Sequence, residues 1–403
     1  MNNTAKKSVL CDLVSRHSAF DFDHYIASHE PEEYDIWNGF CLPMEYTAPA
    51  DEYQAIRQSC ALFDASPMKK IRIKGAEAGA FLDRILTSPV SQLPWMHAAY
   101  GLICNEQGYL IDDGIVYKYN DTDYLLLISE LDLHGHFAKY NDFTDLFIKE
   151  ETENLAGLAI QGPKSCAVLQ QFGFTDVEQL APFELKYFQL AGQQVLVGRV
   201  GFTGDLGYEI WFSPEAISTV EQAIVNTEQA MQITLPGYGL SALQMCRIEA
   251  GMIVPGWDTA GSFTDVIDER TPFELTLGWN VKAERDEYFV GKQALQQAKV
   301  IGPRYKMKGI KVNNKSILAE GQELFALVDN IEIQVGHLPS LVWHETEQQW
   351  IGFASIKSSC VDINDTYVID KKTREAIHCC LHQLPFINLA RRNQTPAPLN
   401  GNR

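Results

Sequence analysis

Hydrophobic and polar positions along the chain follow two periods, and together they predict a mixed fold of helices and strands. Spacing of three and four residues predicts helices at 50–60, 77–86, 164–171, 214–229 and 241–250. Alternation with period two predicts strands at 68–74, 124–128, 157–160, 184–190, 193–200 and 208–212. Residues 1–35 carry no strong pattern and fit one helix followed by a loop.

From residue 307 onward the pattern predicts strands alone. They are expected at 307–312, 331–335, 350–354, 367–369 and 377–381. Turn residues separate them, which is typical of a small antiparallel barrel. Further upstream, Pro163 suits the first position of the helix expected at 164–171, because its ring fixes a helical φ and it lacks an N–H that would be unpaired there.

Residues 105–117 predict a hairpin that contains an unusual pair of acids. Residues 105–108 supply the turn, and strand formers flank Asp112 and Asp113 on both sides. Aspartate is depleted in strands, and neighbouring strand residues point to opposite faces. If one face is buried, one carboxylate points inward, where such groups are paired, hydrogen-bonded or functional. The alternative is an edge position or a bulge that leaves both acids in water.

Composition and charge narrow the class of protein. The chain has 403 residues, enough for two or three domains, with an ordinary 46% hydrophobic and 21% charged residues. It has no apolar run long enough to span a membrane, and the N-terminus lacks the apolar stretch of a signal peptide, so a cytoplasmic protein is expected. A net charge of −19 argues against nucleic acid or an anionic membrane as partner. Nine scattered cysteines without metal-site spacing predict free thiols and no metal.

Short motifs occur in a characteristic order within a stretch that covers roughly Phe40 to Phe386. They lie at 39–46, 55–57, 62–64, 100–102, 111–113, 158–163, 201–209, 247–252, 271–274 and 289–292. Two of the most distinctive are GFTGDLGYE at 201–209 and RIEAGM at 247–252. Together the motifs resemble the aminomethyltransferase (glycine cleavage T-protein) family of tetrahydrofolate-dependent one-carbon enzymes.

The resemblance implies an α+β fold with three modules around a central channel. Two would be α/β modules with antiparallel sheets, and the last a small C-terminal β-barrel. The expected order is an N-terminal extension and entry segment at 1–49, a first folate-binding module with the catalytic hairpin at 50–150, a second folate-binding module at 151–300, and the barrel and tail at 301–403.

The resemblance also implies a tetrahydrofolate site with two carboxylates. Glu209 matches the position whose carboxylate accepts two hydrogen bonds from the pterin ring; a surface glutamate at a strand end is the alternative. Asp113 matches the catalytic aspartate, which stabilises positive charge or accepts a proton during transfer. Asp112 would then face the other way, with a solvent or turn contact expected.

Aromatic and basic positions complete the implied site. Tyr100 and Tyr117 match aromatic positions near the cofactor, with core packing as the alternative for Tyr117, and Tyr187 is a weaker candidate of the same kind. Arg392, or its neighbour Arg391, matches the C-terminal arginine that reaches the glutamate carboxylate of folate. In the 247–252 motif, Arg247 and Glu249 are equally suited to structural pairing and to ligand contact.

The sequence differs from the family pattern in three places, and these differences bear on the identity of the one-carbon donor. Leu243 stands where the family has an arginine, and Ser129 where it has an asparagine. The loop at 255–270 is longer than usual, and its Trp257 and Phe263 are expected to shape the substrate pocket.

The leading hypothesis is therefore a tetrahydrofolate-dependent transferase of the aminomethyltransferase kind, with a small-molecule one-carbon donor and a lipoyl carrier protein as a candidate partner. The alternative is a tetrahydrofolate-dependent demethylase, a methyltransferase that acts on a sulfonium, betaine or methoxy donor. A non-catalytic folate-binding protein is a second alternative, although the K-G-C motif of such proteins is absent. The departures favour the demethylase, whereas the broad match and Asp113 favour the aminomethyltransferase.

Overall fold

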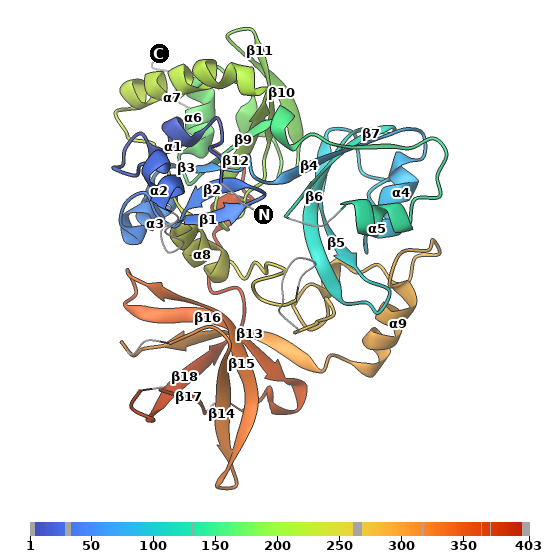
Figure 1. Ribbon diagram of the computed structural model, residues 1–403, viewed down its shortest axis with the longest axis vertical. Coiled ribbons are helices and arrows are strands. Elements are labelled where there is room, and N and C mark those ends of the chain that lie inside the picture. The colour runs from blue at the N-terminus through green and yellow to red at the C-terminus, as the bar shows by residue number, and fades with distance from the viewer. Residues whose placement is uncertain are drawn as a thin grey trace.

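The computed structural model describes residues 5–28, 34–129, 133–260, 268–315, 318–363, 365–370 and 372–396. Within these ranges the strands form two five-stranded sheets, a closed six-stranded barrel and a two-stranded ribbon. Strands pair antiparallel in both sheets and in the barrel. Figure 1 shows the two sheets next to each other, with the barrel below them. The predicted α+β fold with two antiparallel-sheet modules and a C-terminal barrel is thus confirmed.

The first sheet has the strand order β5-β6-β7-β4-β8. Its strands are β4 (Lys69–Lys74), β5 (His97–Cys104), β6 (Leu110–Asn120), β7 (Asp123–Ile128) and β8 (Phe147–Glu150). The helices beside it are α4 (Ala78–Ile85), α5 (Leu133–Lys139) and α9 (Lys292–Ile301). The predicted hairpin is formed by β5 and β6, with a register shift after Ile103. A Cβ on Gly108 in the hairpin turn would lie 3.2 Å from the Leu295 side chain, so α9 packs directly against this turn.

The second sheet has the strand order β10-β11-β12-β9-β3. Its strands are β3 (Ala61–Asp64), β9 (Ala156–Gln161), β10 (Leu185–Leu190), β11 (Gln193–Gly198) and β12 (Gly207–Phe212). The helices around it are α3 (Pro49–Gln58), α6 (Ser165–Gln171), α7 (Ile217–Met231) and α8 (Leu240–Glu249). The N-terminal part adds α1 (Cys11–Ser15), α2 (Phe22–Ser28) and the ribbon of β1 (Tyr34–Trp37) and β2 (Phe40–Pro43).

The two sheets pack against each other through one apolar cluster. Tyr117 and Leu127 of the first sheet share this cluster with Ala159 and Trp211 of the second. The opposite face of each sheet is also covered by apolar side chains, from α4 in the first sheet and from α6 and α7 in the second. The central strands of both sheets are therefore buried on both faces, and this burial of apolar surface strongly stabilises the arrangement.

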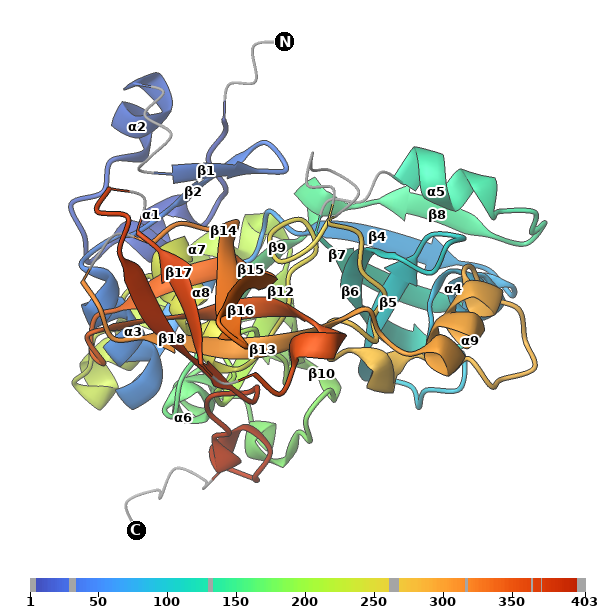
Figure 2. The same cartoon turned by 90° about the horizontal axis from the view of Figure 1, so that it is seen from below.

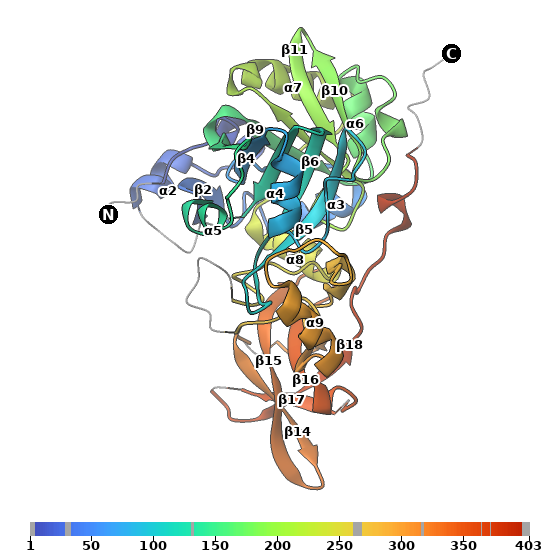
Figure 3. The same ribbon diagram turned by 90° about the vertical axis from the view of Figure 1, so that its right-hand side faces the viewer.

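The C-terminal barrel has the strand order β13-β16-β15-β14-β17-β18. Its strands are β13 (Tyr305–Val312), β14 (Gln322–Val328), β15 (Ile331–His344), β16 (Gln349–Lys357), β17 (Thr366–Ile369) and β18 (Ala376–His382). Figure 2, seen from below, shows the barrel in front of the second sheet. After β18 the chain runs back along the molecule to the second sheet (Figure 3), where it forms the 3₁₀ turn η6 (Ala390–Arg392).

Several sequence predictions differ from the structure in detail. The N-terminal helix is two short helices, and the loop expected after it lies largely outside the described residues. Pro163 lies in the turn before α6, which begins at Ser165. The segment 214–229 is a 3₁₀ turn, η3 (Pro214–Ala216), followed by α7. The strands β1, β2, β3, β8 and β14 and the helices α5 and α9 were not predicted. The remaining 3₁₀ turns are η1 (Thr152–Asn154), η2 (Val177–Gln179), η4 (Gly278–Asn280) and η5 (Ser358–Cys360).

The two sheets draw on interleaved parts of the chain. β3, at 61–64, pairs with β9 in the second sheet, whereas β4, which follows it, belongs to the first. The module boundaries near residues 50, 150 and 300 stay predictions.

Candidate active site

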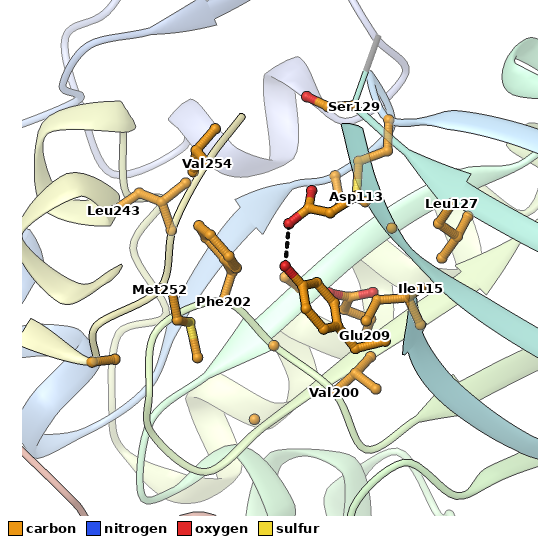
Figure 4. A pocket seen from close by; sticks show the side chains of 18 of the residues that line it. Asp113, Ile115, Leu127, Ser129, Val200, Phe202, Glu209, Leu243, Met252 and Val254 are labelled. Carbon is orange, nitrogen blue, oxygen red and sulfur yellow. Dashed lines mark hydrogen bonds between the residues drawn. The ribbon is translucent and has the colours of Figure 1, made fainter. Parts of the chain in front are cut away.

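A cavity of about 550 Å³ lies where the two sheets, α8 and the C-terminal segment meet. Strands β6 and β12 each contribute a carboxylate, Asp113 and Glu209, and the remaining charged lining residues are Asp35, Arg199, Asp205 and Arg392. Most other lining side chains are apolar or aromatic. In Figure 4, Asp113 and Ser129 lie on one wall, and Leu243, Met252 and Val254 lie across from them.

Asp113 points into the cavity because successive side chains of β6 alternate between the two faces of the sheet. Asp113, Ile115 and Tyr117 share the face of β6 that turns to the second sheet, and the first two line the cavity. The Tyr100 hydroxyl of the neighbouring strand β5 donates a hydrogen bond to Asp113 Oδ2, drawn as a dashed line in Figure 4. Burial, and then the nearby Asp112 charge, raise the pKa of Asp113 to about 7. This carboxylate can therefore change its protonation state close to neutral pH.

Asp112 does not match its predicted environment. Its side chain is fully buried on the opposite face of β6, with no exposure to solvent. Its Oδ1 accepts a hydrogen bond of 2.8 Å from the Asp113 backbone N–H. The expected solvent contact was wrong because this face of the sheet also packs into a core, below α4.

Glu209 lies on β12 directly after a turn rich in glycine. The turn at 201–207 wraps around Gln161: a Cβ on Gly201 or Gly207 would lie 2.2 or 2.3 Å from the amide group of that side chain. A side chain at either position would displace the buried Gln161 amide, and with glycine at both the turn leads into β12 and places Glu209 at the cavity. Burial raises the pKa of Glu209 to about 7, although the hydrogen bond from Tyr117 works in the opposite direction.

The three predicted tyrosines occupy different places. Tyr100 lines the cavity and stacks on Trp279, with the ring centroids 6.1 Å apart. Tyr117 is fully buried behind Glu209, and its hydroxyl lies 3.2 Å from Oε2 of that carboxylate. Tyr187 does not line the cavity; its ring stacks on Tyr119 and is 41% exposed. The structure therefore brings Tyr100 and Tyr117 to the site and leaves Tyr187 outside it.

The two adjacent C-terminal arginines separate into two environments. Arg391 donates to Asp205, with Nε–Oδ1 and Nη2–Oδ2 distances of 2.6 and 2.7 Å. Arg392 lines the cavity, and no carboxylate in the described part of the chain forms an ion pair with its guanidinium. Burial lowers the pKa of Arg392 below the usual arginine value. A partly buried guanidinium of this kind is suited to an anionic group of a ligand.

Comparison with known proteins connects this geometry to a family. A family model described as the GCVT N-terminal domain matches residues 31–285. The aminomethyltransferase of Halothermothrix orenii is 31% identical over 354 residues, which is 87% of this chain and 95% of that protein. The aminomethyltransferase of Thermotoga maritima is 32% identical over 331 residues, which is 81% of this chain and 86% of that protein. The chain belongs to the aminomethyltransferase family.

The fold of this aminomethyltransferase family member also has a solved relative. The crystal structure of the glycine cleavage system aminomethyltransferase T from Bartonella henselae matches with a TM-score of 0.78 and 21% identity, over 95% of this chain and 98% of that chain. Aminomethyltransferases depend on tetrahydrofolate, so this protein is a one-carbon transferase with tetrahydrofolate as its cofactor. Across the described residues, none of the helices is both long and apolar enough to cross a membrane. The cytoplasmic location stays a prediction.

The departures from the family pattern gather at the same cavity. Leu243, Ser129 and Trp257 all line it. Phe263 lies outside the described residues. Trp257 packs next to the buried Arg247, whose guanidinium is 5.6 Å from the Trp257 ring centroid. Leu243 and Ser129, together with Trp257 of the longer loop, therefore face the space that a ligand would occupy.

Arg247 and Glu249 both form buried contacts with other side chains of the protein. Arg247 pairs at 2.6 Å with Asp258, both side chains being fully buried. Glu249 accepts hydrogen bonds from Arg57 Nη2 at 2.7 Å and Tyr53 at 2.8 Å, and lies 3.2 Å from His344 Nε2.

Glu249, His344 and Glu347 also bring ligand atoms within 4.8 Å of one another. However, Glu249 is already paired with Arg57 and Tyr53. We therefore assign no metal to this cluster.

Sequence reasoning missed three residues that shape the site. Trp279, in η4, lies against Tyr100 and is 62% exposed. Arg199, on the cavity wall, donates to the backbone carbonyls of Arg392 and Gln394 and so holds the C-terminal segment in place. Trp211 supports Tyr117 from behind. None of these contacts follows a local spacing rule, because each joins segments far apart in the sequence.

Proposed function

We propose that the protein transfers a one-carbon unit from a small donor to tetrahydrofolate inside the central cavity, with Asp113 at the transfer centre. The observation that carries the proposal is that Asp113, Glu209 and Arg392, from three separate parts of the chain, line one cavity. Its volume of about 550 Å³ falls in the usual range for sites that bind small molecules.

The residues of the cavity suit tetrahydrofolate. Glu209 accepts a hydrogen bond from Tyr117 on Oε2, which leaves acceptor positions for the ring N–H and exocyclic amine of a pterin. Arg392 suits the glutamate carboxylates at the other end of the cofactor. The apolar and aromatic lining between them suits the rings. When bound, the cofactor supplies the nitrogen atoms that receive the one-carbon unit.

Asp113 would act on protons and charge at the transfer centre. With a pKa of about 7, its carboxyl group can accept a proton from an amine or stabilise a developing positive charge. Tyr100 holds this carboxyl group by its hydroxyl. The low polarity of the surrounding wall strengthens both effects.

The donor that we put first is an aminomethyl unit, delivered by a lipoyl carrier protein, as in the family at large. The second candidate is methyl transfer from a sulfonium, betaine or methoxy donor. It is favoured by the apolar Leu243 and the indole of Trp257 on the cavity wall, because aromatic faces attract methylated cations.

The binding experiment measures affinity for tetrahydrofolate by calorimetry in the wild type, Glu209→Ala and a control, Glu221→Ala, which alters an exposed glutamate on α7. We expect Glu209→Ala to weaken binding at least tenfold and the control to bind like the wild type. A wild type that binds no tetrahydrofolate would refute the proposal.

The donor is identified by mass analysis of the folate product. Methylenetetrahydrofolate indicates aminomethyl transfer, and methyltetrahydrofolate indicates demethylation. Leu243→Arg sharpens the distinction, since a positive charge on this wall should repel a cationic methyl donor and reduce its turnover. Tetrahydrofolate that binds without turnover of either donor class would contradict catalysis by Asp113.

A further inference from the structure

Glu209 is the end of a hydrogen-bonded chain that crosses between the two sheets. The indole Nε1 of Trp211 donates to the Tyr117 hydroxyl oxygen at 3.2 Å. The Tyr117 hydroxyl in turn donates to Glu209 Oε2, also at 3.2 Å. Trp211 and Glu209 lie two residues apart on one face of β12, whereas Tyr117 comes from β6 of the other sheet.

The chemistry of indole fixes the direction of this chain. An indole N–H can donate but has no acceptor, whereas a phenol oxygen can do both. Because Trp211 occupies the Tyr117 oxygen as donor, the Tyr117 hydrogen is free to go to Glu209. The buried hydroxyl would lose that partner if Glu209 presented a proton instead. The hydrogen-bonded chain therefore favours the ionised form of Glu209, which accepts hydrogen bonds and can bind the donor groups of a ligand.

Two glycines leave the space that this arrangement needs. Gly157 is opposite Trp211 in the β9–β12 register, and a Cβ there would lie 2.3 Å from the indole Cζ3. Gly198 is opposite Glu209 in the β11–β12 register, and a Cβ there would lie 3.1 Å from the Tyr117 hydroxyl. Neither glycine has a positive φ. Both positions therefore need glycine for the space that a missing side chain leaves, and not for an unusual backbone conformation.

We propose that Trp211 and Tyr117 are positioning residues, which act through Glu209 by holding Oε2 from behind so that the carboxylate accepts hydrogen bonds toward the cavity. The proposal rests on the proposed function for its consequence, cofactor binding. It also changes the expected role of Tyr117, from contact with the cofactor to support of the residue that contacts it.

The charged and titratable groups near Glu209 are few. Tyr117 faces it from β6, and Tyr238 faces it from the segment before α8. Lys70 of β4 lies behind the chain, with its ammonium 5.5 Å from the Trp211 ring centroid. The cavity side carries Asp35, Asp113, Asp205, Arg199 and Arg392. Tyr117→Phe and Trp211→Phe leave all the other groups in place.

The experiment follows the titration of Glu209 by carboxyl-carbon NMR with labelled glutamate in the protein without cofactor. The Glu209 signal is assigned with Glu209→Gln. Glu52 is an internal control, because burial also raises its pKa to about 7 while its partners are the backbone N–H groups of Tyr46, Thr47 and Gly239. Tyr124→Phe is the matched variant, since Tyr124 is a buried tyrosine in the core on the far side of the first sheet.

We expect Tyr117→Phe to move the Glu209 midpoint upward by about one pH unit, the effect of losing one hydrogen bond to a charged group. Trp211→Phe should move it in the same direction by less, and the Glu52 midpoint should stay fixed in both. Tyr124→Phe should leave both midpoints unchanged. An unchanged Glu209 midpoint in folded Tyr117→Phe overturns the proposal.

Binding of 5-formyltetrahydrofolate across the same pH range separates this proposal from the proposed function. In Tyr117→Phe, the midpoint of the affinity profile should move upward together with the Glu209 titration, and affinity should recover at high pH. Loss of affinity by the same factor at every pH would indicate a structural defect and would count against the proposal. A wild type that binds no folate would refute the proposed function, whereas the titration would still test the hydrogen-bonded chain.

Discussion

Asp113 and Glu209 face one cavity from two different sheets, and each carboxylate is held by a tyrosine hydroxyl. Asp113 on β6 accepts from Tyr100, and Glu209 on β12 accepts from Tyr117. Burial raises the pKa of both acids to about 7. Both groups are therefore sensitive to pH in the neutral range, and their tyrosine partners stabilise the ionised forms.

Asp113→Asn should separate catalysis from binding. The amide keeps the shape of the side chain but accepts no proton, so turnover should fall about a hundredfold or more. Affinity for tetrahydrofolate should change by less than about threefold, because Glu209 and Arg392 remain. Steady-state kinetics and calorimetry on the same preparation measure the two effects. Turnover near the wild-type level would remove Asp113 from the mechanism.

The raised pKa of Asp113 predicts a specific dependence of stability on pH. Its folded value, about 7, lies above its usual value of 3.8, so between these values the folded state holds a proton that the unfolded state releases. Stability should therefore fall as pH rises through this window.

Urea unfolding of the wild type and Asp113→Asn tests this dependence. The variant should be more stable near pH 8, on the order of 2 kcal/mol, and the difference should vanish near pH 4. A wild type that gains stability between pH 5 and about pH 7 relative to the variant would contradict the assignment.

The two C-terminal arginines should respond differently to substitution. Arg392→Ala should weaken folate binding about tenfold or more with little change in thermal stability, since Arg392 has no ion-pair partner in the described part of the chain. Arg391→Ala should lower stability by about 1–3 kcal/mol, because it removes one partner of the buried Asp205. Calorimetry and thermal unfolding of both variants provide the comparison, and equal effects on folate affinity would rule out a special role for Arg392.

Gly157→Ala should displace Trp211, the residue that donates to Tyr117 behind Glu209. The added methyl group would overlap the Trp211 ring, so we expect a loss of about 1–3 kcal/mol of stability. In the double variant with Trp211→Phe, the smaller ring should relieve part of this loss, and a double-mutant cycle measures the coupling. Additive losses would show that the glycine is not required by the indole.

The sequence by itself determined most of the elements. Alternation and turn residues located the β5–β6 hairpin and most strands of both sheets and the barrel. It also indicated Asp113, Glu209 and a C-terminal arginine through the family resemblance. It did not identify β14, whose apolar Leu324 and Ala326 alternate over a short stretch that ends in exposed apolar residues.

Tertiary structure alone decided how the candidate residues are used. Period-two alternation separates Asp112 from Asp113, but both faces of β6 are buried, so the pattern cannot say which face meets the cavity. Likewise, Arg391 and Arg392 are equivalent in sequence, and their roles separate because Asp205 and Arg199 fix the C-terminal segment. The positions of the two tyrosines also depend on tertiary packing. Tyr117 contacts Glu209 of the other sheet, whereas Tyr187 stacks on Tyr119 outside the cavity. Side chains from distant segments set these positions, and local sequence patterns carry no information about such contacts.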